Sequence, residues 1–142
     1  MCRRSKSGPL AVSVPTRPAV KLPMRFDDEL LYDELLTAPD EALDDADFGV
    51  IALDDDHRVV FYNRIESALS GLTPERVVGR LFFSEVAPCT NNFMVAYRFE
   101  TEEQLDATID YVFTLRMTPT PVRLRLLRRP AAPLQYLLVQ RS

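Results

Sequence analysis

The C-terminal third of the chain has the clearest alternation of hydrophobic and polar positions. In residues 108–117 the odd positions are large and hydrophobic, whereas most even positions are polar. Because successive side chains of a strand point to opposite faces of a sheet, this pattern predicts a strand with one buried face. In residues 122–126 hydrophobic positions alternate with Arg123 and Arg125, which predicts a second strand with its arginines outward. A third strand is expected over residues 134–141, after a turn bounded by prolines.

Two shorter runs of β-favouring hydrophobic residues occur earlier, at 48–53 and 58–62. Three aspartates and His57 separate them, which predicts a polar hairpin turn. A metal site at these side chains is the less favoured interpretation, because such a cluster is typical of a solvated turn.

Short helices are predicted between the first two strands and the last three strands. One is expected over residues 63–70 and ends at Gly71, and another begins with Thr73 as its cap and Pro74 at its first position. Residues 92–105 predict a longer helix whose inward residues are Phe93, Ala96, Tyr97 and Phe99. The predicted order is two strands, several short helices and three strands. We therefore expect an α+β domain with a five-stranded antiparallel sheet and helices across one face.

Charge divides the chain before this domain. Residues 1–25 contain six basic residues, four prolines and no acidic residue, which predicts a disordered basic arm. This arm could contact nucleic acid or an acidic partner, but it could equally be a solubilising terminus or a tail that folds against the acidic segment behind it. No aromatic residue interrupts it, so stacking on bases is not expected.

The acidic segment that follows predicts a helical cap. Residues 26–56 contain thirteen acidic residues and no basic one. A helix is expected over residues 27–37 with Asp27 or Asp28 as its cap, and a second turn around residues 41–46. Because so short a helix is marginal alone, we expect residues 26–47 to dock on the domain of residues 48–142 and to detach at modest cost.

Length and cysteine content limit the class of protein. The chain has 142 residues, of which 46% are hydrophobic and 27% charged, as expected of one globular domain. Its two cysteines, Cys2 and Cys89, lie far apart and form no disulfide scaffold, which suits a reducing compartment and predicts a cytoplasmic protein. No hydrophobic run approaches the roughly 20 residues of a membrane span, so no membrane contact is expected.

Three stretches of the domain carry a specific resemblance. They are residues 61–66 (FYNRIE), residues 79–90, which include Val86-Ala87-Pro88-Cys89-Thr90, and residues 117–120 (MTPT). Together they resemble the photoactive yellow protein family of blue-light receptors, and the likeness extends over residues 48–141. The order of the predicted elements is that of the PAS domain, the fold that this family uses.

The resemblance implies a chromophore and the residues that hold it. In this family p-coumaric (4-hydroxycinnamic) acid is bound covalently as a thioester, and Cys89 is the matching cysteine. Tyr62 and Glu66 would hydrogen-bond the phenolic oxygen of the chromophore, and Ser70 would support Tyr62. Met117 would lie near the chromophore and assist its thermal recovery.

The chemistry of these residue types agrees with that role. A thiolate is the nucleophile that forms a thioester, and a buried phenolate needs strong hydrogen bonds to stay ionised. To donate such a bond at neutral pH, Glu66 must be protonated, which burial and the charge of the phenolate favour. Light-driven trans–cis isomerisation would then draw a proton from Glu66. A buried Glu66 carboxylate without a partner would cost several kcal/mol by order of magnitude, and the 26–47 cap is a natural place to release that strain.

The sequence departs from the family pattern in three places. Leu72 and Leu115 stand where the best-known members have an arginine and a tyrosine, and Ser70 stands where threonine is usual. A looser cover over the chromophore would change colour or cycle rates but leave attachment intact.

Two other functions remain open at this stage. The first is a chromophore-free PAS module that binds a small ligand or another protein. The second is an enzyme with Cys89 as nucleophile, which is disfavoured because its one candidate base, His57, is expected on the surface. We expect a non-enzymatic monomer or weak dimer that signals to a separate protein, and no binding of nucleic acid.

Overall fold

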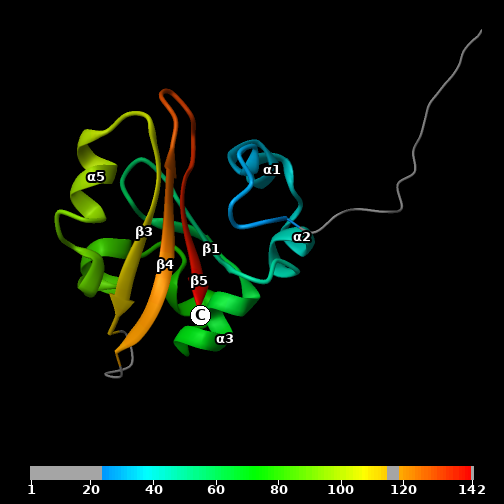
Figure 1. Cartoon of the computed structure of the whole chain (residues 1–142). Coiled ribbons are helices and arrows are strands. Elements are labelled where there is room, and N and C mark those ends of the chain that lie inside the picture. The colour runs from blue at the N-terminus through cyan, green and yellow to red at the C-terminus, as the bar shows by residue number, and fades with distance from the viewer. Residues whose placement is uncertain (1–23, 115–118, 142) are drawn as a thin grey trace, which may run out of the picture.

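Five strands form a single antiparallel sheet, which confirms the predicted architecture. The computed structural model describes residues 24–114 and 119–141. The strand order across the sheet is β2-β1-β5-β4-β3, so the last strand lies at the centre (Figure 1). The strands are β1 (Gly49–Leu53), β2 (Val59–Tyr62), β3 (Leu105–Phe113), β4 (Thr120–Arg128) and β5 (Gln135–Arg141).

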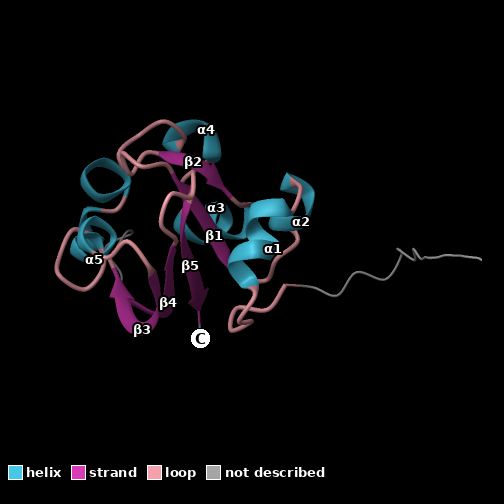
Figure 2. Cartoon of the chain, turned by 90° about the horizontal axis from the view of Figure 1, so that it is seen from above, coloured by secondary structure: helices cyan, strands magenta, loops and turns pink. Residues whose placement is uncertain are grey.

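Short helices cover both faces of this sheet. Helices α3 to α5 lie on one side, and α1 and α2 lie on the other, as the view from above shows (Figure 2). The helical elements are α1 (Leu31–Thr37), α2 (Asp40–Asp44), α3 (Arg64–Ser70), α4 (Pro74–Val77), the π-helix η1 (Phe82–Val86), the 3-10 helix η2 (Pro88–Thr90) and α5 (Ala96–Thr101). Among the residues that the structure describes, we find no helix with the length and hydrophobicity to cross a bilayer.

Alternate side chains of the central strands pack into two separate hydrophobic cores, one on each face of the sheet. Leu137 packs with the α3–α5 side, whereas its neighbours Tyr136 and Leu138 pack with the cap. All three side chains are no more than 1% exposed. A continuous hydrophobic run is what a strand covered on both faces requires, and this explains the composition of β5.

A buried arginine, Arg125, binds the cap to the sheet. The prediction that this side chain is outward and solvated is therefore wrong. Arg125 of β4 points away from the α3–α5 side, but it is 5% exposed rather than solvated because the cap covers it. Its guanidinium donates to both carboxylate oxygens of Asp106 and to the main-chain carbonyls of Phe26 and Asp28. Arg123, on the same strand face, is exposed as predicted.

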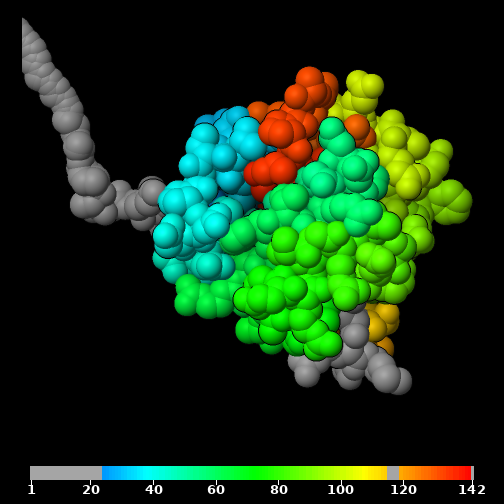
Figure 3. Space-filling model, turned by 180° about the vertical axis from the view of Figure 1, so that it is seen from behind, coloured from blue at the N-terminus to red at the C-terminus, as the bar shows by residue number. Residues whose placement is uncertain are grey.

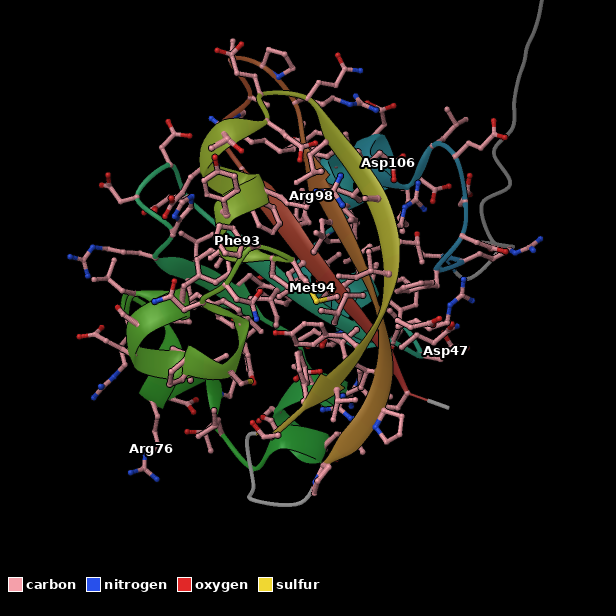
Figure 4. The ribbon with its side chains drawn as sticks, turned by 60° about the vertical axis from the view of Figure 1, so that its left-hand side comes forward. Asp47, Arg76, Phe93, Met94, Arg98 and Asp106 are labelled. Carbon is pink, nitrogen blue, oxygen red and sulfur yellow. The ribbon has the colours of Figure 1, made fainter. Side chains whose placement is uncertain are left out.

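Helix boundaries differ from the predictions at two places. Helix α1 begins at Leu31, not near residue 27, because Asp28 accepts a hydrogen bond from the Leu30 amide within a preceding turn. The helix expected over residues 92–105 is reduced to α5, because β3 already begins at Leu105. Phe93 in the segment before α5 (Figure 4) and Tyr97 are 80% and 51% exposed, so the prediction that they face inward is wrong.

Candidate functional site

Tyr62 and Ser70 meet inside the domain through a direct hydrogen bond. Tyr62 ends β2, and Ser70 ends α3 after two turns of helix. The Tyr62 hydroxyl donates to Ser70 Oγ over 2.8 Å, and both residues are buried. Gly71 ends the helix directly after Ser70 in the left-handed conformation, at φ 82°, as the sequence predicts. Burial, and then the negative charge of Glu66, raise the pKa of Tyr62 above its ordinary value, so its hydroxyl keeps its proton.

Glu66 is a fully buried acid in the first turn of α3. Asn63 caps this helix, and its Oδ1 accepts from the Glu66 amide over 3.1 Å. The carboxyl group lies against β1 at Gly49, where a Cβ atom would stand only 2.3 Å from Glu66 Oε1. The site therefore needs a glycine in this strand, and the side chain is confined by the backbone beside it.

The Glu66 carboxylate has a charged partner that sequence reasoning missed. Arg141, at the end of β5, donates from Nη1 to Glu66 Oε1 over 2.9 Å and from Nη2 to Oε2 over 3.5 Å. Burial raises the pKa of Glu66 above its ordinary value, and the Arg141 guanidinium opposes part of that rise. The two residues are 75 positions apart, so no local motif signals their contact.

Cys89 lies in the middle of η2, on a loop that side chains from other segments hold in place. Its carbonyl accepts a hydrogen bond from the Tyr111 hydroxyl of β3 over 2.5 Å and another from Asn92 Nδ2 over 3.3 Å. Thr90 Oγ1 donates to the Ala87 carbonyl over 2.7 Å, which closes the short helix. Cys89 itself is half-buried, and its thiol is free.

The hydrophobic core between the sheet and helices α3–α5 connects the two parts of the site. Tyr62 is a member of this core, and Cys89 and Leu72 pack against it. Within the described residues the structure thus brings Tyr62 and Ser70 into direct contact and buries Glu66 close enough for its charge to act on Tyr62. It places Cys89 against the core that contains Tyr62. Met117 and Leu115 lie outside the described residues, so their expected positions stay predictions.

Two surface hollows border the site. A groove of about 340 Å³ lies where α2 meets β2, α3 and α4, and Tyr62 contributes to its lining. Figure 3 shows this face, with the cap in cyan beside the segment of residues 60–80 in green. A second hollow of about 210 Å³ lies between α4 and η1, with Leu72 and Val86 in its wall. The second hollow brings solvent close to the core on which Cys89 packs.

His57 occupies the hairpin turn predicted for it, but it is not fully on the surface. Its ring centroid lies 5.3 Å from that of Phe83 in an edge-to-face contact, and the residue is half-buried. Its backbone lies in the left-handed region, at φ 65°, within this turn. Burial lowers the pKa of His57, so the ring is neutral at pH 7.

A buried acid, a buried tyrosine and a free thiol are together groups that can hold a small aromatic acid. The thiol offers a point of covalent attachment, and the acid and the tyrosine offer hydrogen-bond donors to an oxygen that carries negative charge. Buried ionisable groups with shifted pKa values are a feature of many functional sites. The donor set therefore fits a phenolic group that is held through a thioester.

Comparisons with known proteins show the fold and the relatives of this chain. Residues 37–132 match the family model of the PAS fold. The chain is 31% identical to photoactive yellow protein from Rhodothalassium salexigens over 83% of the chain and 97% of that relative. It is 32% identical to photoactive yellow protein from Halochromatium salexigens over 72% of the chain and 85% of that relative.

A solved structure shows the same likeness in three dimensions. The photoactive yellow protein domain of the sensor histidine kinase Ppr from Rhodospirillum centenum superposes with a TM-score of 0.71 at 37% identity. The match covers 77% of the chain and 98% of that domain.

Proposed function

We propose, from the premise that the chain belongs to the photoactive yellow protein family and has its PAS fold, that it is a blue-light photoreceptor with p-coumaric acid bound as a thioester to Cys89. The observation that carries the proposal is the complete burial of Glu66, whose charge acts on Tyr62, a member of the core on which Cys89 packs. A carboxyl group at 0% exposure is costly to the fold, so its presence there favours a role in binding or proton transfer.

Cys89 is the proposed attachment residue. Its thiolate would attack the carbonyl carbon of an activated p-coumaroyl ester, forming the carbon–sulfur bond as the leaving group departs. The half-buried position of Cys89 would limit the access of water to a thioester there and so slow its hydrolysis. Tyr111 and Asn92 hold the Cys89 carbonyl, so the sulfur starts from a fixed backbone.

Tyr62, Ser70 and Glu66 are the proposed partners of the phenolic oxygen. When bound, the chromophore supplies absorption of blue light and a double bond that isomerises. Tyr62 now donates to Ser70, and a short rotation of the hydroxyl would redirect that proton while Ser70 continues to support the side chain. Glu66 in its protonated form would donate a second hydrogen bond, and after light absorption its carboxyl proton would leave for the phenolic oxygen.

The signal would then reach a separate protein through the outer parts of the domain. The relative from Rhodospirillum centenum is a domain of a sensor histidine kinase, so a kinase is one class of partner to test. Asn63 links α3 to the cap, because its Nδ2 donates to the Leu43 carbonyl over 2.8 Å. A shift of Glu66 in the same helix would therefore displace Asn63 and, through this hydrogen bond, residues 26–47.

Reconstitution of the purified apoprotein tests the proposal. Mixing it with an activated p-coumaroyl ester should give a yellow band that bleaches under blue light and recovers in the dark. Cys89→Ala should abolish the band, and the control Cys2→Ala should retain it. A protein that stays colourless, or a band of equal strength in Cys89→Ala, would overturn the proposal.

A further inference from the structure

The buried Glu66 carboxyl has a built-in counter-ion. Glu66 is 0% exposed and the Arg141 side chain 17% exposed, and their closest oxygen and nitrogen are 2.9 Å apart. A surface ion pair contributes little, but breaking a pair that is removed from water leaves an uncompensated charge. The contact is therefore strong enough to influence which protonation state Glu66 adopts.

The surrounding backbone directs the carboxyl group toward Arg141. Asn63 fixes the first turn of α3 by accepting from the Glu66 amide, and Gly49 of β1 lies directly beside Oε1. The same Oε1 accepts from Arg141 Nη1. Because β1 pairs with β5, with Gly49 opposite Val139, the end of β5 brings the guanidinium to this side of the helix.

We propose that Arg141 is a positioning residue that holds the negative charge of Glu66 after Glu66 has given up its proton. This inference rests on the proposed function and adds a residue to it. The proton leaves the Glu66 carboxyl for the phenolic oxygen of the chromophore, and the carboxylate that remains pairs with the guanidinium. The charges of the pair then sum to zero. The Glu66 carboxylate therefore has a partner after proton transfer, contrary to the expectation from the sequence that it would have none.

Two opposing effects act on the protonation of Glu66. Burial favours the protonated carboxyl and Arg141 favours the carboxylate. Among the described residues, Arg141 from β5 and Tyr62 from β2 are the charged or titratable groups that act on Glu66, and β1 presents the backbone of Gly49 there. By favouring the carboxylate, Arg141 lowers the energy that transfer of the Glu66 proton requires, which suits a light-driven switch.

Titration of Glu66 in the apoprotein tests the pair without any chromophore. The carboxyl carbon of Glu66 can be followed by NMR with ¹³C-labelled glutamate and assigned with Glu66→Gln. Arg141→Gln should raise the proton affinity of Glu66 by about tenfold or more, because the opposing charge is gone. The matched control Arg76→Gln removes an equal charge from an arginine that extends away from the domain (Figure 4) and should leave the titration unchanged. Equal titrations in wild type and Arg141→Gln would overturn the inference.

A double variant covers the case in which Arg141→Gln fails to fold. Glu66→Gln with Arg141→Gln leaves neither charge unpaired, so at alkaline pH, where Glu66 of Arg141→Gln would otherwise be a buried unpaired carboxylate, it should fold and melt at a higher temperature than Arg141→Gln. A double variant that is no more stable than Arg141→Gln would overturn the pairing.

Infrared difference spectra of the loaded protein complete the test. Loss of the protonated Glu66 carbonyl band on illumination should be smaller in Arg141→Gln than in wild type, and an equal loss would contradict the inference. If Cys89 takes up no chromophore, the proposed function fails, and the apoprotein titration still decides the pairing of Glu66 with Arg141.

Discussion

At the scale of single residues, short-range rules predict only some members of the site. Tyr62, Glu66 and Ser70 lie within nine positions of one another, so a strand end and two helical turns are enough to bring them together. Asn63 and Gly71 mark the two ends of that helix in the sequence itself. Arg141 was not predicted, because its contact depends on which strand of the sheet lies beside β1. Strand order of this kind has no signature within the residues involved.

Leu72 provides a residue-scale prediction about the cover of the site. It is half-buried against the core that contains Tyr62 and lines the hollow between α4 and η1. We expect Leu72→Arg to shift the absorption maximum or the dark recovery rate of the loaded protein and to leave attachment at Cys89 intact, since a guanidinium would bring charge close to the chromophore. Visible spectra and flash photolysis measure both quantities.

Leu69→Arg is the matched control for that variant. Leu69 lies on the same helix–turn segment and is 44% exposed, so its substitution should leave colour and recovery unchanged. Identical spectra and recovery in Leu72→Arg and wild type would contradict a role for Leu72 in covering the chromophore.

At the scale of elements, the cap depends on β4 for its attachment. Arg125 joins β4, β3 and the first residues of the cap through four hydrogen bonds, and Tyr32 of α1 donates to the Leu134 carbonyl over 2.6 Å. The aromatic ring of Tyr32 also lies edge-on to Tyr136 of β5. The cap is therefore bound by polar contacts as well as by its hydrophobic residues, and whether it detaches at modest cost stays a prediction.

Substitution of Arg125 tests this attachment. Arg125→Leu should lower the free energy of unfolding by about 2 kcal/mol, because two main-chain carbonyls and Asp106 lose their donor. Amide hydrogen exchange in α1 should accelerate more than exchange in β5. The control Arg123→Leu removes an exposed arginine of the same strand that also faces an aspartate of β3, at 4.0 Å, and should change stability by no more than about 0.5 kcal/mol. Equal effects of the two variants would contradict the assigned role of Arg125.

Alternation predicts strands better than it predicts the short helices of this domain. The odd residues 109, 111 and 113 of β3 face the core as expected, because the period of two is independent of tertiary context. The inward face predicted for residues 92–105 is wrong at Phe93 and Tyr97, whose rings instead contact each other at 5.5 Å on the surface. Aromatic spacing alone cannot distinguish a buried helix face from an exposed aromatic pair.

At the scale of the whole molecule, the cap packs across the sheet from the core of the site and touches the site helix α3 at its N-terminus, where Asn63 donates to the Leu43 carbonyl. The proposed chromophore residues lie with the α3–α5 side, whereas α1 and α2 lie across the sheet (Figure 2). The sequence predicts both layers and their order along the chain. It does not predict that Arg125 is buried between them, because that depends on how the cap docks.

The stability of the whole fold should depend on pH through Glu66. Its pKa is raised in the folded state by burial, so between its ordinary value of 4.5 and the folded value the native protein binds more protons than the unfolded chain. The free energy of unfolding should therefore fall as the pH rises through that window and lose this dependence above it. Glu66→Gln should lack this slope. Urea denaturation at a series of pH values measures it.

The exposed Glu75→Gln on α4 is the control for this pH dependence. It should retain the wild-type slope, although the absolute stability of either variant can differ from that of wild type. A Glu66→Gln variant with the same slope as wild type would show that Glu66 does not titrate differently in the two states.

The hydrogen bond from the Tyr111 hydroxyl to the Cys89 carbonyl connects the loop of Cys89 to the edge of the sheet. Tyr111 belongs to β3, the strand at the rim of the sheet, and its neighbour Val112 is 50% exposed on the opposite side. The oxygens of Tyr111 and Cys89 are already 2.5 Å apart, so they cannot move closer. In the proposed photoreceptor, a movement of Cys89 after light absorption would therefore either break this hydrogen bond or displace β3, which would pass a local change to the outer edge of the molecule.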